Sequence, residues 1–283
     1  MKKIKLITDS ASDISLKLAE ENDIHIIPMN ISFGDETFKD MYEISTEEFY
    51  RRLKAEKELP KTAQISINDF EEVFKKFADY DIIYVSISSK ASGTYQNACI
   101  ARNMILEENA DAQITVVDSN TFTYGYGMWL VYAAEKIKQG ATKDEIVSYL
   151  ESCTKQTEIM LTVDSLEYLQ RGGRIKSSAK IIANVLDLHP ILYTEDGLIM
   201  SFSKVRGAKK LIEKLADIVA ERIGDCHKMG VLHADSPETI EKLKEALLTR
   251  IPDASFLNGE VGSCIGVHAG PGAFGVIYMK KEM

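Results

Sequence analysis

The sequence predicts an α/β protein whose amino-terminal part is a parallel sheet with helices on both faces. Short apolar runs rich in β-forming residues alternate along the chain with amphipathic runs that carry helix-start signals. Such alternation is typical of strand–helix–strand units, which build parallel sheets covered on both sides. The expected strands are residues 4–8, 24–32, 82–87, 114–117, 159–163, 229–233 and 276–279.

Helix starts between these strands are marked by capping residues. Residues 45–48 and 142–145 both fit a capping box, in which a Ser or Thr side chain accepts a hydrogen bond from the backbone three residues later. Ser66 stands before a run in which Phe70 and Phe74 fall on one face. These signals predict helices that pack an apolar face against the sheet.

The second half of the chain changes character. An apolar helical run at 179–188 is expected to precede a hairpin that turns at Asp196-Gly197. Helices at 208–223 and 237–249 and a glycine-rich tail follow. We therefore expect an α/β domain over residues 1–156 and a second, α+β domain over residues 157–283.

Composition limits the classes of function. With 45% apolar and 27% charged residues the chain has the balance of a folded protein, and its net charge of −9 disfavours a nucleic-acid binder. No apolar run is long enough for a signal peptide or a membrane span, so a cytoplasmic location is expected. The four cysteines are widely spaced and form no CxxC, which predicts reduced thiols and no metal site.

Four expected strands end in the same dipeptide, Asp-Ser. Asp and Ser are good turn and helix-capping residues, which is one explanation. The other is functional, because α/β sheets build their sites at the carboxyl ends of parallel strands. Both explanations stay open for the four dipeptides, which lie at 9–10, 118–119, 164–165 and 235–236.

The loop after the strand at 82–87 is a candidate anion site. Ser92, Gly93 and Thr94 open the following helix, where free N–H groups and the helix dipole favour a carboxylate or a phosphate. Alternatively, Ser92 only caps this helix. The polar residues 61–66 also precede a helix, but such loops are common and this one carries little weight alone.

The glycine-rich tail contains a formal GxGxxG at residues 270–275. It precedes a strand instead of opening a helix, so it does not indicate a dinucleotide site. These glycines are expected to let the backbone pass close to a ligand or a neighbouring element, and His268 stands just before them. The chain has no P-loop, HExxH or GxSxG pattern.

Taken in order, six segments resemble the DegV family, which includes the FakB-like carrier proteins of bacterial fatty acid kinase systems. Each is weak alone, but together they are specific and span the chain. They are ITDSASDIS at 7–15, KTAQIS at 61–66, SSKASGTYQ at 88–96, LEYLQRGGRI at 166–175, KVR at 204–206 and HAGPG at 268–272.

The resemblance implies a two-domain α/β protein that encloses a long-chain fatty acid such as palmitate, stearate or oleate and needs no cofactor. By analogy Thr62 and Ser92 bind the lipid carboxyl group and His268 lies near it. A separate fatty acid kinase then phosphorylates the bound carboxyl group, and an acyltransferase of phospholipid synthesis uses the product. The carrier itself is not expected to be an enzyme. Supporting positions are Ser66, Gly93 and Thr94.

The chain departs from the family pattern at a few positions. Ala63 and Ile65 replace a serine and a proline, and Ala91 stands where a branched apolar residue is usual. These departures put the preferred chain length and unsaturation of the lipid in doubt. His189 stands where the family often has lysine.

Arg171, Arg174 and Arg206 form a candidate basic patch. The resemblance suggests docking of the acyl-phosphate product, the kinase or an anionic membrane during transient contact. The alternative is helix-end charges and surface ion pairs.

The sequence also admits two rival functions. A serine acyl hydrolase would use Ser92 as nucleophile and His268 as base, but Ser92 has no nucleophile-elbow context and no orienting acid can be assigned. A DNA-binding regulator would need a basic recognition face, which the acidic charge and the absence of a clear helix-turn-helix disfavour.

Overall fold

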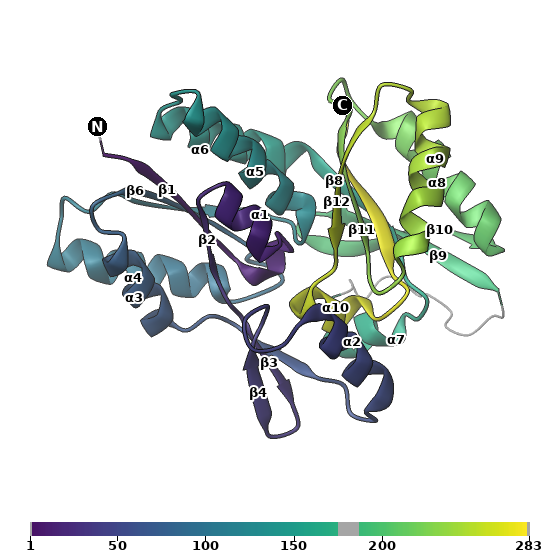
Figure 1. Cartoon of the computed structure of the whole chain (residues 1–283), viewed down its shortest axis with the longest axis horizontal. Helices are drawn as coiled ribbons and strands as arrows, with labels where there is room; N and C mark the ends of the chain where they lie inside the picture. The colour runs from purple at the N-terminus through teal and green to yellow at the C-terminus, as the bar shows by residue number, and fades with distance from the viewer. Residues whose placement is uncertain (1, 175–186, 282–283) are drawn as a thin grey trace.

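We describe the computed structural model of the protein over residues 2–174 and 187–281 (Figure 1). The helical run expected at 179–188 lies largely outside the described residues. At its end, Asp187 lies in a turn and Leu188 already begins a strand. Within the described residues, no helix is both long and apolar enough to cross a membrane.

The amino-terminal half contains the expected parallel sheet, with strand order β2-β1-β6-β7. Helices α3 and α4 lie on one side of the sheet and α5 and α6 on the other (Figure 1). The short helix α1 (Leu16–Glu21) connects β1 to β2. The bounds are β1 Ile4–Asp9, β2 Ile24–Ile27, β6 Asp81–Ser86, β7 Ile114–Asp118, α3 Ile67–Lys76, α4 Thr94–Glu108, α5 Tyr124–Lys138 and α6 Lys143–Gln156.

The helix starts follow the predicted capping chemistry with one exception. Thr142 and Glu145 form a complete capping box on α6. At α2 (Thr46–Ala55), Ser45 accepts a hydrogen bond from the Glu48 N–H at 3.2 Å, but the Glu48 carboxylate pairs with Arg51 instead of closing the box. That box is therefore only half formed.

The single strand expected at 24–32 is wrong, because the chain breaks there into two strands of different sheets. Strand β3 (Asn30–Phe33) leaves the parallel sheet and pairs with β4 (Glu36–Lys39) and β5 (Lys61–Ala63) in a small antiparallel sheet. Pro28 has no N–H to donate, and the Met29 N–H is taken by the Ser10 hydroxyl at 3.1 Å.

A six-stranded sheet forms the second half, in the order β10-β9-β8-β13-β11-β12. Its pairs are antiparallel except for β11 with β12. The predicted hairpin is confirmed: Asp196 and Gly197 have φ of 52° and 72°. The bounds are β8 Thr157–Thr162, β9 Leu188–Glu195, β10 Leu198–Arg206, β11 Lys228–His233, β12 Ser255–Glu260, β13 Phe274–Met279, α7 Glu167–Gly172, α8 Ala208–Arg222, α9 Pro237–Arg250 and α10 Ser263–Ala269.

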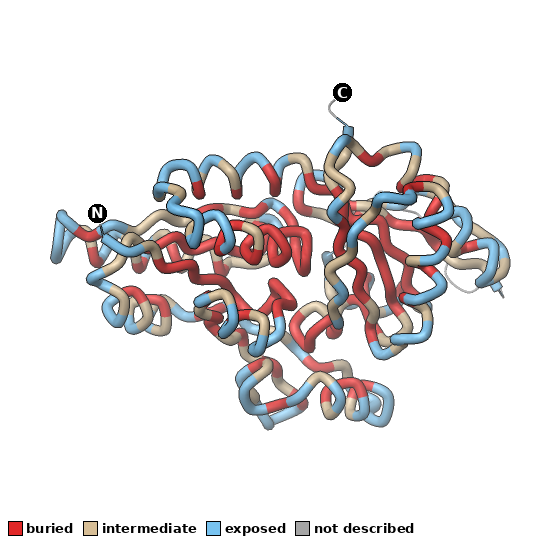
Figure 2. Tube along the Cα trace, turned by 45° about the horizontal axis from the view of Figure 1, so that its top comes forward, coloured by how far each residue is buried: buried red, intermediate tan, exposed pale blue. Residues whose placement is uncertain are grey.

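The two faces of this second sheet bury different partners. Met160, on β8, belongs to an outer core with residues of α8 and α9. Its neighbours Ile159 and Leu161 point to the opposite face and join the core of the amino-terminal half, as strand alternation requires. Figure 2 shows buried chain along both sheets and where the halves meet. One core therefore contains residues of both halves and does not mark where one domain ends. The domain boundary near residue 157 stays a prediction.

Candidate ligand-binding site

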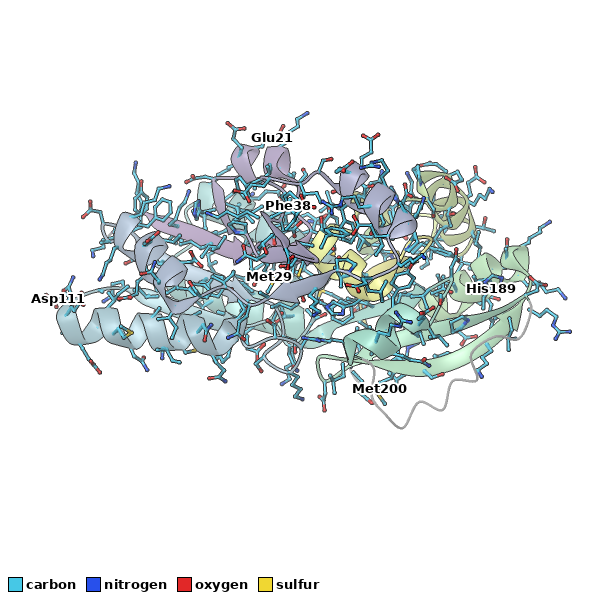
Figure 3. The ribbon with its side chains drawn as sticks, turned by 90° about the horizontal axis from the view of Figure 1, so that it is seen from below. Glu21, Met29, Phe38, Asp111, His189 and Met200 are labelled. Atoms are coloured by element: carbon cyan, nitrogen blue, oxygen red, sulfur yellow. The ribbon has the colours of Figure 1, made fainter. Side chains whose placement is uncertain are left out.

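A cavity lies between the two sheets. Its empty volume is about 1200 Å³, part of it open to solvent, and apolar side chains from both halves line it. Figure 3 places Met29, a lining residue, near the middle of the long axis, with Asp111 and His189 toward opposite ends. Six of the apolar lining residues are Ile87, Phe122, Ile159, Leu161, Leu232 and Ile277.

Three distant segments bring Thr62, Ser92 and His268 into the wall of this cavity. Thr62 lies on β5, Ser92 precedes α4, and His268 lies on α10. The Thr62 Oγ1 and His268 Nε2 atoms are 3.4 Å apart. The Ser92 hydroxyl lies 2.9 Å from the hydroxyl of Thr94. The wall therefore offers two hydroxyls and an imidazole to a ligand.

Two glycines allow these polar segments to pack together. A β-carbon on Gly93 would lie 2.9 Å from Cδ of Gln64, which ties the loop before α4 to β5. A β-carbon on Gly172 would overlap Nδ1 of His268 and lie 3.1 Å from its Cε1. The glycine at the end of α7 thus makes room for the imidazole ring, which explains part of the Arg-Gly-Gly-Arg motif.

Arg174 also lines the cavity, although the sequence placed it only among docking residues. Its guanidinium donates to the Ala91 carbonyl at 3.3 Å and to the Gly172 carbonyl. Burial, with the positive charge of Arg174, lowers the pKa of His268 to about 4. The imidazole is therefore neutral near pH 7, and Arg174 supplies positive charge that suits a carboxylate or a phosphate.

The supporting positions differ in their placement. Gly93 lines the cavity and Thr94 is buried as the first residue of α4, whose amino-terminal dipole favours an anion. Ser66 does not line the cavity; it is an exposed residue that caps α3 through Asp69. The sequence motifs alone do not distinguish Gly93 and Thr94, which lie at the site, from Ser66, which does not.

The three arginines of the expected basic patch lie in different places. Arg171 is exposed and forms an i,i+4 ion pair with Glu167 at 2.8 Å. Arg206 ends β10, roughly 26 Å along that strand from Leu198 at about 3.3 Å per residue. Because Gly197, next to Leu198, lines the cavity, Arg206 stands well away from that part of the wall along the strand.

Two of the four departures from the family pattern lie in the cavity wall. Ala63 and Ala91 line the cavity, whereas Ile65 is buried in the core behind it. His189 lies toward one end of the molecule (Figure 3), with its Nε2 3.6 Å from a carboxylate oxygen of Asp187. Ala63 and Ala91 can therefore influence directly which ligand fits the cavity.

Two of the four Asp-Ser dipeptides, at 9–10 and 118–119, organise loops. Asp9 accepts from the Ile87 N–H at 2.9 Å, and Asp118 accepts from the Ser89 N–H at 3.1 Å. These bonds fix the loops that end neighbouring parallel strands. Turn chemistry and site building are thus combined at these two dipeptides.

The arrangement does not favour a serine nucleophile. The hydrogen-bond partner of His268 Nε2 is Thr62, and its Nδ1 atom is buried without a partner among the described residues. A catalytic base needs an orienting acid at that nitrogen. The described residues also contain no group of three or more His, Cys, Asp or Glu side chains placed to hold a metal ion.

Fold and site together define an α/β protein with an apolar cavity between its two larger sheets and a wall that carries polar side chains. A family model described as "Uncharacterised protein, DegV family" matches residues 3–281. A DegV domain-containing protein of Caldanaerobacter subterraneus is 38% identical over 99% of this chain and 100% of the relative. The chain belongs to the DegV family.

Solved structures of the family share the fold. DegV of Bacillus subtilis, described as a fatty acid binding protein, aligns with a TM-score of 0.85 and 31% identity over 99% of this chain and all of its own. A stearic acid-binding protein from Eubacterium ventriosum aligns with a TM-score of 0.87 and 28% identity over 99% of each chain. The cavity thus occurs in a fold that these two fatty acid binding proteins share.

Proposed function

We propose that this protein binds one long-chain fatty acid in the cavity, with the carboxyl group held by Thr62, Ser92 and His268. The observation that carries the proposal is the meeting of three polar side chains from separate segments in the wall of one otherwise apolar cavity. The stearic acid named for the Eubacterium ventriosum neighbour supports a long-chain fatty acid as ligand. Palmitate, stearate and oleate are the candidates.

The energetics support binding driven by burial of the acyl chain. Burying one methylene contributes about 0.8 kcal/mol, so about 14 methylenes supply roughly 11 kcal/mol before immobilisation costs. These costs are on the order of several kcal/mol, which leaves roughly 6–8 kcal/mol, or an affinity in the micromolar range. The polar wall then has to orient the head group more than to bind it.

Neutral His268 and charged Arg174 have complementary tasks in this proposal. His268 can donate one ring N–H to the carboxylate, as the hydroxyls of Thr62 and Ser92 also can. Arg174 provides the compensating charge and a planar set of donors that suits a carboxylate or the phosphate of an acyl phosphate. This division follows from the pKa of His268, which is lowered to about 4.

We further propose that the protein is a carrier and not an enzyme. A separate fatty acid kinase would phosphorylate the presented carboxyl group, and an acyltransferase of phospholipid synthesis would take the acyl phosphate, with transient membrane contact. The exposed Arg171 and Arg206 are candidate docking residues for the kinase. Charge reversal at both should reduce phosphorylation by a cognate kinase and leave lipid content unchanged. Normal turnover would remove the docking assignment.

A matched set of variants tests the head-group site. The double substitution Thr62→Ala with Ser92→Ala should sharply lower the fatty acid content of the purified protein, because two donors to the carboxylate are lost. Ser66→Ala is the control: this residue caps α3 outside the cavity, so it should cost about 1 kcal/mol of stability without changing lipid content. Unchanged lipid content in the double variant would refute the assignment.

A further inference from the structure

The segment at the end of β1, residues 9–13, does not line the cavity, yet its polar groups bind residues that do. The Asp9 carboxylate accepts from the Ile87 N–H at 2.9 Å, and the Ser10 hydroxyl accepts from the Met29 N–H at 3.1 Å. Both Ile87 and Met29 lie in the cavity wall. The segment is therefore a second layer behind the wall.

Asp13, at the end of this segment, joins two further parts of the wall. One carboxylate oxygen accepts from the Thr123 hydroxyl at 2.5 Å, and the other accepts from the Gly262 N–H at 3.1 Å. Thr123 lines the cavity, and Gly262 is the residue immediately before α10, which carries His268. A β-carbon on Gly262 would lie 2.9 Å from the Asp13 oxygen, so this close approach depends on glycine.

Thr123 has an unusual backbone conformation, with φ of 51° and ψ of −142°. β-Branched residues rarely adopt positive φ, and such conformations persist only where the surroundings hold them. Two bonds to the segment hold Thr123: its N–H donates to the Ala11 carbonyl at 2.9 Å, and its hydroxyl donates to Asp13. Without Asp13, this part of the cavity wall is free to relax.

Stability alone explains the Asp13 carboxyl group poorly. The side chain is buried, and that burial, with the nearby charge of Asp40, raises its pKa well above the ordinary range despite the hydrogen bond from Thr123. Buried charged groups contribute little net stability, because their desolvation offsets their bonds. A role in fixing geometry accounts for its position better.

We infer that Asp13 is a positioning residue for the cavity: it holds Thr123 and the start of α10, and so sets the shape of the wall against which the ligand packs. The choice of palmitate as the test ligand rests on the proposed fatty acid binding. The inference about the wall rests only on the contacts of Asp13 with Thr123 and Gly262.

A double-mutant cycle on palmitate affinity tests the inference. Asp13→Ala and Thr123→Val, which is isosteric but lacks the hydroxyl, should each raise the Kd for palmitate about tenfold, within the range of couplings between hydrogen-bonded residues. The double variant should bind no more weakly than either single one, and Thr123→Ser should restore most of the affinity. Additive losses, or a Kd unchanged while thermal stability falls, would overturn the inference.

A second measurement works without ligand. Isoleucine δ1-methyl NMR signals of the delipidated Thr123→Val protein should shift for the cavity-lining Ile87 and Ile159, while Ile240 and Ile251 of the outer core stay in place. Unchanged signals at the cavity would contradict the role of Asp13 even if palmitate binds. If the wild type fails to bind palmitate, the proposed function falls, and these signals alone decide the inference.

Discussion

Replacing Gly172 with alanine moves His268 without altering any polar group of the site. Gly172 ends α7, and its φ is not positive, so alanine is compatible with the backbone there. The new β-carbon would overlap Nδ1 of His268 and lie 3.1 Å from its Cε1. The imidazole must therefore leave its place beside Thr62.

The expected loss follows from the hydrogen bond that His268 gives to the carboxylate in the proposed complex. A hydrogen bond to a charged group contributes about 1.5–3 kcal/mol, which corresponds to roughly 10–150-fold in Kd. We expect Gly172→Ala to weaken palmitate binding by this factor. We also expect the pKa of His268 to rise from about 4 toward its ordinary value, because the displaced ring gains solvent.

Calorimetric titration with palmitate and NMR titration of the His268 ring measure the two effects. Gly173→Ala is the matched control, because Gly173 has φ of 68° and nothing within 4 Å of a β-carbon there. It should cost roughly 1–2 kcal/mol of stability through backbone strain and leave the Kd unchanged. Wild-type affinity and an unshifted His268 pKa in Gly172→Ala would refute the reasoning.

Two further outcomes are expected. First, the ring of His268 stays neutral in the folded protein down to about pH 4, whereas in the unfolded chain it binds a proton below about pH 6.5. The contribution of the neutral ring to the free energy of unfolding is therefore present above pH 6.5 and is lost as the pH falls to 4. Urea unfolding at pH 7.5 and pH 4.5 should show the wild type losing up to about 3 kcal/mol more than His268→Gln, and equal losses would contradict the burial of a neutral ring. Second, Leu161→Ala and Met160→Ala should each cost about 2–5 kcal/mol, but only Leu161→Ala enlarges the cavity. Its bound lipids, identified by mass spectrometry, should shift toward longer or branched chains, and a matching shift in Met160→Ala would argue against the assigned faces.

The sequence was most informative where local chemistry decides the structure. The hairpin at Asp196-Gly197 was predictable because both central residues of such a turn need positive φ, which Asp and Gly tolerate. The parallel sheet followed from the alternation of apolar and amphipathic runs. Thr62, Ser92 and His268 could be singled out from the resemblance of their segments to the family motifs.

Features that depend on long-range contacts could not be predicted in this way. The strand expected at 24–32 divides at Pro28, which the sequence shows, but the bond from the Met29 N–H to Ser10 that holds the break appears only in the structure. Helix α10 is short and contains Gly266, so neither length nor helix propensity indicated it. Arg174 follows α7, which contacts α10, and lines the cavity, and its spacing in the motif gives no sign of this.

The contacts of residues 9–13 show the same limit more clearly. Asp13 reads as a turn residue in sequence, and its φ of 55° agrees. Its partners Thr123 and Gly262 lie more than a hundred residues away along the chain. Only the folded structure brings the three together behind the cavity.

The central claim is that the cavity holds one fatty acid, and the most direct measurement is of what the purified protein carries. The protein would be prepared without added lipid and denatured, and the organic extract would be analysed by mass spectrometry. Near-stoichiometric C14–C18 fatty acid in the wild type, with much less in the Thr62→Ala, Ser92→Ala double variant, is the predicted result. An empty extract, followed by no uptake of added palmitate or oleate, would contradict the account.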